Sequence, residues 1–443
     1  MVLPIRLPRG KPDPLSAQSG GHIAVALSRS MAGRQRVRAV AVDEHATVTP
    51  LELFFDLVFV FTLTQVTTLM AGDLTVSGMV RGVLVVSVLW WCWVGWSWIG
   101  NLVRADEGFI RIAMFVAMTA MFIAALTIPE SFTDHPGGLS GPVVFAVCYF
   151  VVRLAHFGTF WSVSSGDPGL RRQLVKFIPS VVIGTGLLLV ASQLTGPAQT
   201  LMWLAALVGD YFGTVLAGAS GWRVKSASHF AERHGLVILI ALGESVVSIG
   251  IGVTDLPISW PIIVASTLGL MIAGALWWAY FDVVALVAER VLARAKGEER
   301  NRIARDSYSL LHLPMIVGII FLALGLKKVL GYVGGGDGHS LTDPLYGIPL
   351  VALYGGASLY LLAHVAFSWR NIHSVNVPRA VVAVVLLALI PLVAGLPAMA
   401  TLALLAAILV GMIAFEAIRY AGARDAVRHH GDIATSGQEP TVA

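Results

Sequence analysis

Long apolar segments alternate with short polar connections from about residue 50 to residue 420. A helix needs about 20 mostly apolar residues to cross the hydrocarbon core of a bilayer. The pattern therefore predicts twelve membrane-spanning helices, near residues 51–70, 80–100, 110–129, 142–163, 174–193, 198–219, 230–252, 260–287, 309–330, 345–369, 378–396 and 398–418.

Composition agrees with this pattern. Hydrophobic residues make up 56% of the 443-residue chain and charged residues 13%, against roughly 25% charged residues in a soluble domain. We expect an all-α polytopic membrane protein, and the composition excludes a soluble one. The polar ends are expected to form a disordered basic cytoplasmic tail (residues 1–48) and a second cytoplasmic tail (residues 421–443).

Basic residues fall almost entirely in every second connection. Only Arg81, Lys327 and Lys328 lie in the other set of connections, and Arg153 lies within a predicted helix. By the positive-inside rule, both termini face the cytoplasm. The net charge of +4 then reflects attraction to anionic lipid, and we expect no nucleic acid as a partner.

Two stretches nearly repeat each other. Leu154-Ala155-His156 is followed by Trp161, and Leu362-Ala363-His364 is followed by Trp369 at the same spacing. Six helices return the chain to its starting side of the membrane, so a duplication predicts two parallel six-helix repeats, at residues 49–220 and 221–420. Chance matches in a chain of biased composition are the alternative.

Two segments carry a specific resemblance. Residues 50–60 read PLELFFDLVFV, and residues 229–245 read HFAERHGLVILIALGES. Together they resemble the bacterial low temperature requirement protein A family, over about residues 45 to 420. The resemblance implies a multi-span protein of the bacterial inner membrane and says little about molecular activity.

The first helix also shows a weaker likeness. Residues 55–59 (FDLVF) are similar to the Phe-Ser-Asp opening of helix 1 in two-repeat endolysosomal and bacterial potassium channels. Phe55 stands where that family has serine, and the seventh helix has no Phe-x-Asp. A potassium pore is therefore an option and not a conclusion.

Acidic and amide side chains within the spans are candidates for a transport path or for ion and proton binding. Asp56 lies near the start of the first helix, and Gln65 lies deeper in it. Glu244 lies past the middle of the seventh helix, where an ionised acid costs roughly 2.5–3.5 kcal/mol. It must be protonated, paired or hydrated, so it either binds a proton or cation or makes a structural hydrogen bond.

Other polar residues within the spans have structural alternatives. Arg153 and Asp210 match in depth and are expected to form a buried ion pair. His156 and His364, which carry the repeat, can shuttle protons or pack with a single hydrogen bond. Five more polar residues mark the entries of corresponding helices: Glu52, Glu232, His234, Arg111 and His312.

Neither metal nor cofactor chemistry is indicated, because no HExxH or CxxC spacing occurs. We expect no catalytic residues. The tryptophans of residues 90–98 are expected to form an aromatic belt at the membrane surface.

The polar residues within a duplicated bundle favour a transporter or channel for a small ion or solute, possibly proton-linked. Its expected partners are the lipid bilayer, the ion or solute, and further copies of the chain as a homo-oligomer. Two alternatives stay open. One is a membrane-embedded enzyme acting on a lipid-linked substrate, and the other is a sensory or accessory scaffold.

Overall fold

The structure is a computed structural model, which describes residues 41–44, 46–254, 256–422 and 424–428. This part of the chain is helical, without a β-strand beyond two isolated bridges. Its long helices are α2 (Pro50–Gly72), α3 (Val76–Leu102), α4 (Gly108–Leu126), α5 (Gly141–Val163), α6 (Pro168–Ala191), α7 (Gly196–Ala217), α8 (Ala227–Gly252), α9 (Trp260–Phe281), α12 (His312–Val333), α13 (Ile348–Ile372), α14 (Val377–Val393) and α15 (Ala398–Arg419).

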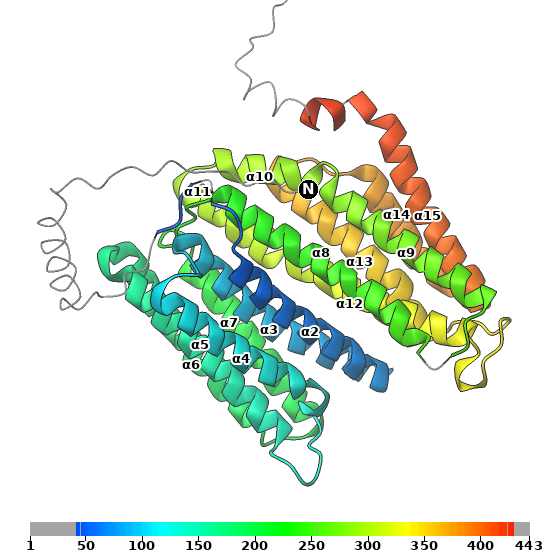
Figure 1. Cartoon of the computed structure of the whole chain (residues 1–443), viewed down its shortest axis with the longest axis horizontal. Coiled ribbons are helices and arrows are strands. Elements are labelled where there is room, and N and C mark those ends of the chain that lie inside the picture. The colour runs from blue at the N-terminus through cyan, green and yellow to red at the C-terminus, as the bar shows by residue number, and fades with distance from the viewer. Residues whose placement is uncertain (1–40, 45, 255, 423, 429–443) are drawn as a thin grey trace, which may run out of the picture.

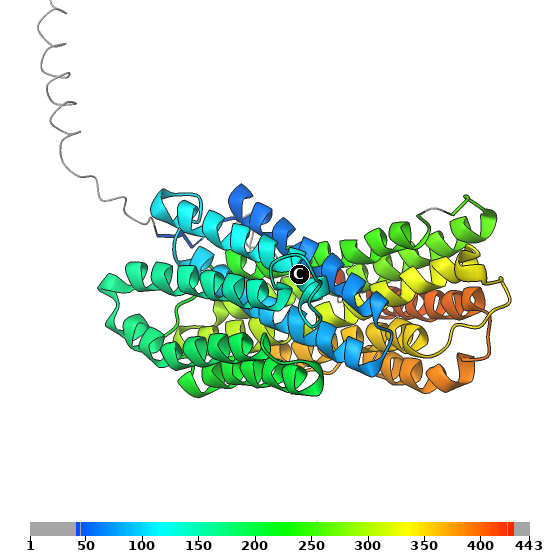
Figure 2. The ribbon, with the colours of Figure 1, turned by 90° about the horizontal axis from the view of Figure 1, so that it is seen from below.

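The long helices run roughly side by side in two groups (Figure 1). Helices α2 to α7 form one group, and α8 to α15 form the other, as the view from below also shows (Figure 2). The groups meet where α2 and α3 pack against α8 and α12. Side chains at this junction are therefore shared by segments that lie far apart in the sequence.

Ten candidate spans in the described part of the chain are long and apolar enough to cross a membrane. This supports a multi-pass membrane protein. Helix α14 is apolar but has 17 residues, and α7 is not among the ten. The count of twelve spans and the two parallel repeats therefore stay predictions.

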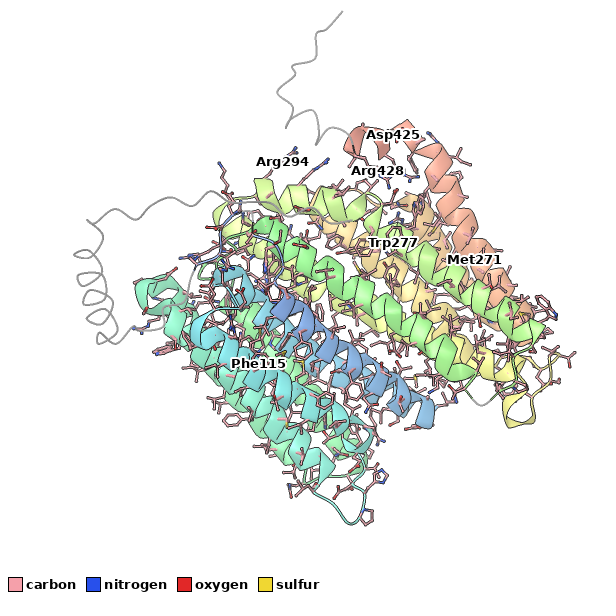
Figure 3. All side chains as sticks on the ribbon, in the orientation of Figure 1. Phe115, Met271, Trp277, Arg294, Asp425 and Arg428 are labelled. Carbon is pink, nitrogen blue, oxygen red and sulfur yellow. The ribbon has the colours of Figure 1, made fainter. Side chains whose placement is uncertain are left out.

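The outside of the helix bundle is apolar, as a bilayer requires. Phe115, Met271 and Trp277 lie on outer helix faces (Figure 3), and each side chain is more than one-third exposed. Large exposed apolar surfaces mark contact with a membrane or a partner. The exposed side chains cover most of the outer helices, so a surrounding bilayer fits them.

Helix α3 is different, because nearly all of it is buried inside the bundle. Trp90, Trp93 and Trp96 are at most 1% exposed, and Trp90 stacks on Trp93 with ring centroids 4.7 Å apart. The prediction of an aromatic belt at the membrane surface was therefore wrong. These rings fill the core between the two groups of helices.

Short helical pieces connect α9 to α12. Helices α10 (Val284–Arg294) and α11 (Gly297–Ile303) lead into a π-helical turn, η3 (Ala304–Leu310). A π-helix inside an α-helix is rare and is frequently found at functional sites. Here it lies directly before His312, at the start of α12.

The predicted tails lie mostly outside the described residues. Within the described part, Ala41 forms a β-bridge with Val103 at the end of α3. Arg424 and Arg428, beyond α15, both form ion pairs with Asp282 at the end of α9. These contacts fix the described chain ends to the same end of the bundle.

Candidate functional site

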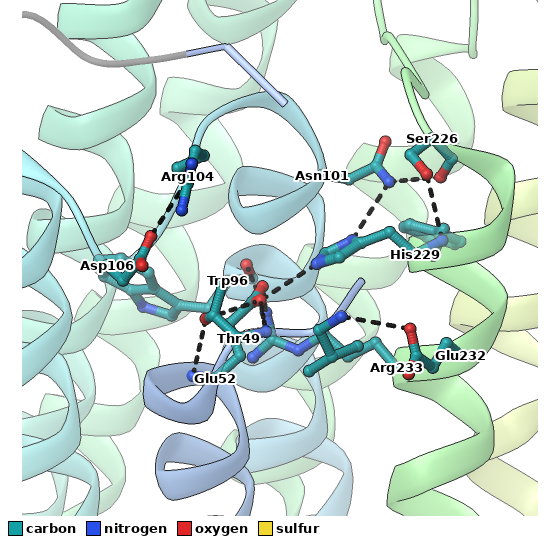
Figure 4. A network of polar contacts seen from close by, with 12 residues as sticks. Thr49, Glu52, Trp96, Asn101, Arg104, Asp106, Ser226, His229, Glu232 and Arg233 are labelled. Atoms are coloured by element: carbon teal, nitrogen blue, oxygen red, sulfur yellow. Dashed lines mark hydrogen bonds and ion pairs between the residues drawn. The ribbon is translucent and has the colours of Figure 1, made fainter. Parts of the chain in front are cut away.

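A capping box starts α2. The Glu52 backbone N–H donates to Thr49 Oγ1 (3.3 Å), and the Thr49 N–H donates to Glu52 Oε2 (3.0 Å). This exchange satisfies two backbone donors that a helix start leaves open. It also fixes the Glu52 carboxylate at the junction of α2, α3 and α8 (Figure 4).

Glu52 also joins α2 to α8. Arg233 Nη1 donates to Glu52 Oε1 (2.7 Å), and His229 Nε2 lies 3.1 Å from Glu52 Oε2. All three side chains are almost completely buried. Removing one partner of a buried ion pair costs about 3–5 kcal/mol, because the other charge is left uncompensated. This cluster therefore fixes α8 against α2.

Asp56 lies one turn deeper and shares the same arginine. Its Oδ1 accepts from Arg233 Nη2 (3.3 Å) and from Trp93 Nε1 (2.7 Å), and its buried Oδ2 has no hydrogen-bond partner in the described chain. Two carboxylates beside one guanidinium leave an excess negative charge.

This cluster is reached through a polar pocket of about 370 Å³. Glu52 and His229 line its inner wall, and Thr49, Arg104 and Asp106 line its rim. Gly100 also lines the pocket. A side chain would not fit there, because a Cβ atom would overlap Glu52 Oε1 and come within 2.9 Å of Arg233 Nη1. The buried charges thus have access from this end of the bundle.

Glu244 forms a second polar site deeper along the same two helices. Thr64 of α2 donates to Glu244 Oε2 (2.6 Å), and Ser248 donates to Oε1 (3.0 Å). On α2, Thr64 and not its neighbour Gln65 forms this hydrogen bond, and Thr67 also lies within hydrogen-bonding range of the carboxylate. The Glu244 side chain is buried, and Lys327 of α12 lies within electrostatic range.

An apolar layer separates the two polar sites. Arg233 and Glu244 are eleven positions apart, which is about 16 Å along a helix at 1.5 Å per residue. Most of the buried side chains between them are apolar, among them Phe59, Leu63, Val237, Ile238 and Ala241, and the buried Thr62 hydroxyl donates to the Val58 carbonyl of its own helix (3.5 Å). The polar sites on α2 and α8 are therefore not continuous with each other.

His234 and His312 meet beside the first polar site. Their ring centroids are 5.2 Å apart, and Tyr308 of η3 stacks on His312. The His312 Nδ1–H donates to the Ser307 carbonyl (3.0 Å), so Nε2 accepts from the Tyr280 hydroxyl (2.8 Å). Since His234 Nδ1 is bonded to the Phe230 carbonyl (2.8 Å), its Nε2 faces the aromatic cluster without a partner in the described chain.

Each group of helices also holds a buried arginine–carboxylate pair. In the first group, Arg153 Nη2 lies 3.4 Å from Asp210 Oδ1, and the Tyr149 hydroxyl donates to Asp210 Oδ2. His156 lies one turn from Arg153 and packs against the backbone of α3 at Gly95, where a Cβ atom would come within 2.7 Å of the ring.

In the second group, Arg379 donates to both Glu416 oxygens, the shortest distance being 2.6 Å from Nη2 to Oε2. Arg379 Nη1 also lies 2.9 Å from His364 Nδ1 and donates to the Ala279 carbonyl (2.8 Å). His156 and His364 thus each lie next to one of the two buried arginines, and neither histidine contacts Glu244.

Two of the remaining predicted residues, Glu232 and Arg111, lie on the surface of the protein. Glu232 is exposed and accepts from the Val48 N–H (3.2 Å), and Arg111 is exposed and donates to the Asp106 carbonyl. The structure therefore brings Glu52, Asp56 and His234 into one region. It places Glu244 in a second region and Gln65, Glu232 and Arg111 outside both.

Sequence comparison assigns the chain to a family. The profile of the bacterial low temperature requirement A protein family matches residues 47–414, which include both polar sites. The chain belongs to this family. An uncharacterized protein of Rhizobium meliloti (strain 1021) is 27% identical over 290 residues, which cover 62% of this chain and 67% of the relative. No solved structure matches the chain.

The family resemblance seen in residues 50–60 and 229–245 is thus confirmed. In this low temperature requirement A protein, those two segments face each other, because they carry Glu52 and Asp56 on one side and His229 and Arg233 on the other. Within the described residues, no three His, Cys, Asp or Glu side chains are placed to hold a metal ion.

Sequence reasoning missed several members of the buried clusters, among them Arg233, Arg379, His229 and Trp93. Arg233 and Arg379 were assigned to basic connections, and His229 and Trp93 were not singled out. One signal was available: His229 and Arg233 are four residues apart, as are Glu52 and Asp56, so each pair shares one helix face. These spacings identify two polar helix faces, and the packing of α2 against α8 decides that the two faces meet.

Proposed function

We propose that this protein is a membrane transporter or channel for a small ion or solute, linked to protons through Glu244. The observation that carries the proposal is the Glu244 site itself. A buried carboxylate is held by Thr64 and Ser248 between two long apolar helices. Ionisable residues at such depth are expensive and typically mark ion pathways or proton relays.

The arrangement of the polar sites supports a path along α2 and α8. The polar pocket opens to Glu52 at one end of the bundle, and Glu244 lies beyond the apolar layer toward the other end. A closed carrier or a closed pore needs such a layer, because a continuous polar path would leak ions. Transport then requires α2 and α8 to move relative to each other.

Flux measurements on purified protein in proteoliposomes test this proposal. We expect the wild type to move protons, potassium or sodium, and Glu244→Gln to reduce the flux at least about tenfold, as loss of an essential charge predicts. Glu298→Gln is the matched control, because it removes one exposed acid far from the path. Its flux should equal that of the wild type.

A further variant tests the hydrogen bond to the Glu244 carboxylate separately from the carboxylate itself. Thr64→Val removes the 2.6 Å hydrogen bond and keeps the acid, so it should reduce flux less than Glu244→Gln does. A proton-coupled carrier predicts that Glu244→Gln abolishes coupled flux. A pore predicts conductance that survives with altered ion selectivity. Unchanged flux in Glu244→Gln would contradict the proposed role of Glu244.

A further inference from the structure

A second pocket lies at the opposite end of α8, away from Glu52. It has a volume of about 290 Å³ and is lined by the end of α8, the last turns of α12, the connection from α12 to α13, Leu74 after α2 and Pro349 at the start of α13. Its polar side chains are Lys327, Lys328, Tyr332 and His339. This volume is at the lower end of the range for small-molecule sites.

The two lysines give the pocket a positive charge that no ion pair with a described residue neutralises. Lys327 and Lys328 are half-buried, and neither forms an ion pair with a described residue. By contrast, Arg81, the other basic residue expected on this side of the membrane, lies 3.9 Å from Asp73. Two adjacent ammonium groups repel each other, so an anion between them is stabilised by both.

Asp343, a described acid that contacts the pocket residue His339, is already bonded to other groups. Asp343 Oδ2 accepts from the Ser340 N–H (2.9 Å) and lies 3.3 Å from His339 Nδ1, while the Ser340 hydroxyl donates to Oδ1 (2.6 Å). These hydrogen bonds, from Ser340 first, hold the pKa of Asp343 below its ordinary value. Asp343 therefore positions His339, whose ring stacks on Tyr332 with centroids 3.6 Å apart.

Lys327 also connects this pocket to Glu244. Helices α8 and α12 touch at this level, because a Cβ atom on Gly252 would come within 2.7 Å of the Lys327 carbonyl oxygen. Lys327 and Glu244 interact electrostatically. An anion in the pocket and the Glu244 carboxylate would therefore compete for the same ammonium group.

We propose that this pocket binds a small anion through a carboxylate or phosphate group held by Lys327 and Lys328, and that Lys327 couples its occupancy to Glu244. The anion-binding part stands by itself, and the coupling rests on the proposed function. A phosphate group can come from a free anion or from a lipid headgroup. In both cases the charged oxygens meet the same two ammonium groups.

Binding is measured on the full chain in detergent, with inorganic phosphate and acetate as free anions and dihexanoyl phosphatidic acid as the lipid headgroup. We expect at least one of the three to bind, and Lys328→Met to weaken its binding about tenfold, as loss of one charge-assisted contact predicts. Arg81→Met is the matched control. It removes a positive charge on the same side without touching the pocket, so binding should not change.

A measurement on the wild type avoids dependence on folding of the variants. Bound anion should slow the acetylation of Lys327 and Lys328 several-fold and leave that of Lys225, at the other end of the bundle, unchanged. Protection by phosphatidic acid alone would identify a lipid headgroup as the ligand. Protection by phosphate or acetate would identify a free anion. No binding and no protection with any of the three would overturn the proposal.

Coupling is tested with Glu244→Gln. Removing this carboxylate frees Lys327, so the anion should bind about threefold tighter or better, within the usual range of coupling between sites. Unchanged affinity would overturn the coupling and leave the anion pocket in place. Anion binding is measured in detergent and does not depend on transport. If the protein binds the anion but shows no flux, the proposed transport function fails and the anion site stands.

Discussion

At the scale of single residues, the buried charges depend on close backbone approach. Gly100 of α3 leaves the space in which Glu52 and Arg233 form their 2.7 Å ion pair. No side chain at that position would fit without moving one of the two. Both side chains are at most 1% exposed, so separating them would leave two buried charges without a partner.

Replacing Gly100 should therefore destabilise the protein. In Gly100→Ala the added methyl group overlaps Glu52 Oε1, and we expect a loss of about 3–5 kcal/mol, the cost of breaking a buried ion pair. Thermal unfolding of the detergent-solubilised protein, followed by size-exclusion chromatography, measures the change. Gly250→Ala in α8 is the control, because its Cβ would have no neighbour within 4 Å. An equal melting temperature in Gly100→Ala and the wild type would contradict this.

Local sequence could predict part of this cluster. The spacing of Glu52 and Asp56 placed both on one face of α2, and the depth of Glu244 in its helix marked it as unusual. Sequence could not show that Arg233 is the partner of Glu52, because the two are 181 positions apart and their contact depends on how α2 and α8 pack. Charge counting placed Arg233 in a connection, whereas α8 already begins at Ala227.

At the scale of elements, η3 is held by α3. Trp90 Nε1 donates to the Ser309 carbonyl (2.8 Å), and Trp98 Nε1 lies 3.0 Å from Ser309 Oγ. Both the carbonyl and the hydroxyl of this π-helical residue therefore bond to buried indoles of α3. The hydropathy pattern showed an apolar segment here and could not show a π-turn, since the turn depends on this tertiary contact.

Weakening that contact should loosen the turn. Trp90→Phe keeps an aromatic ring and removes the indole donor, which leaves a buried carbonyl unsatisfied at about 1–3 kcal/mol. We expect amide hydrogen exchange in residues 304–312 to rise about tenfold. Trp260→Phe, at a position 79% exposed, should leave exchange in this segment unchanged. Equal rates in both variants would show that the indole does not hold η3.

At the scale of the whole molecule, the alternation of long apolar helices was readable from hydropathy, because each span satisfies its own backbone hydrogen bonds. The packing order of the helices was not readable, since lipid-facing and buried apolar residues look alike in sequence. Helix α3 illustrates this: its sequence resembles its neighbours, but it contacts both groups of helices.

The orientation of the bundle can be tested by cysteine labelling. The positive-inside rule predicts that Leu139 lies outside and Ser220 inside the cell, and both positions are exposed in the structure. A membrane-impermeant thiol reagent should label Leu139→Cys in intact cells and Ser220→Cys only after permeabilisation. The native Cys92 and Cys148 are buried, so the wild type gives the background. The reverse labelling pattern would show that the protein has the opposite orientation in the membrane.

The central position of α3 has a consequence for biosynthesis. Its tryptophans bond to Ser309, more than 200 positions later in the chain. During synthesis, α3 must therefore enter the membrane long before its final neighbours exist, with Trp90 and Trp98 facing lipid or the insertion machinery. The early helices cannot reach their mature packing until α12 has been made, so assembly of this protein is completed after translation of its second half and not helix by helix.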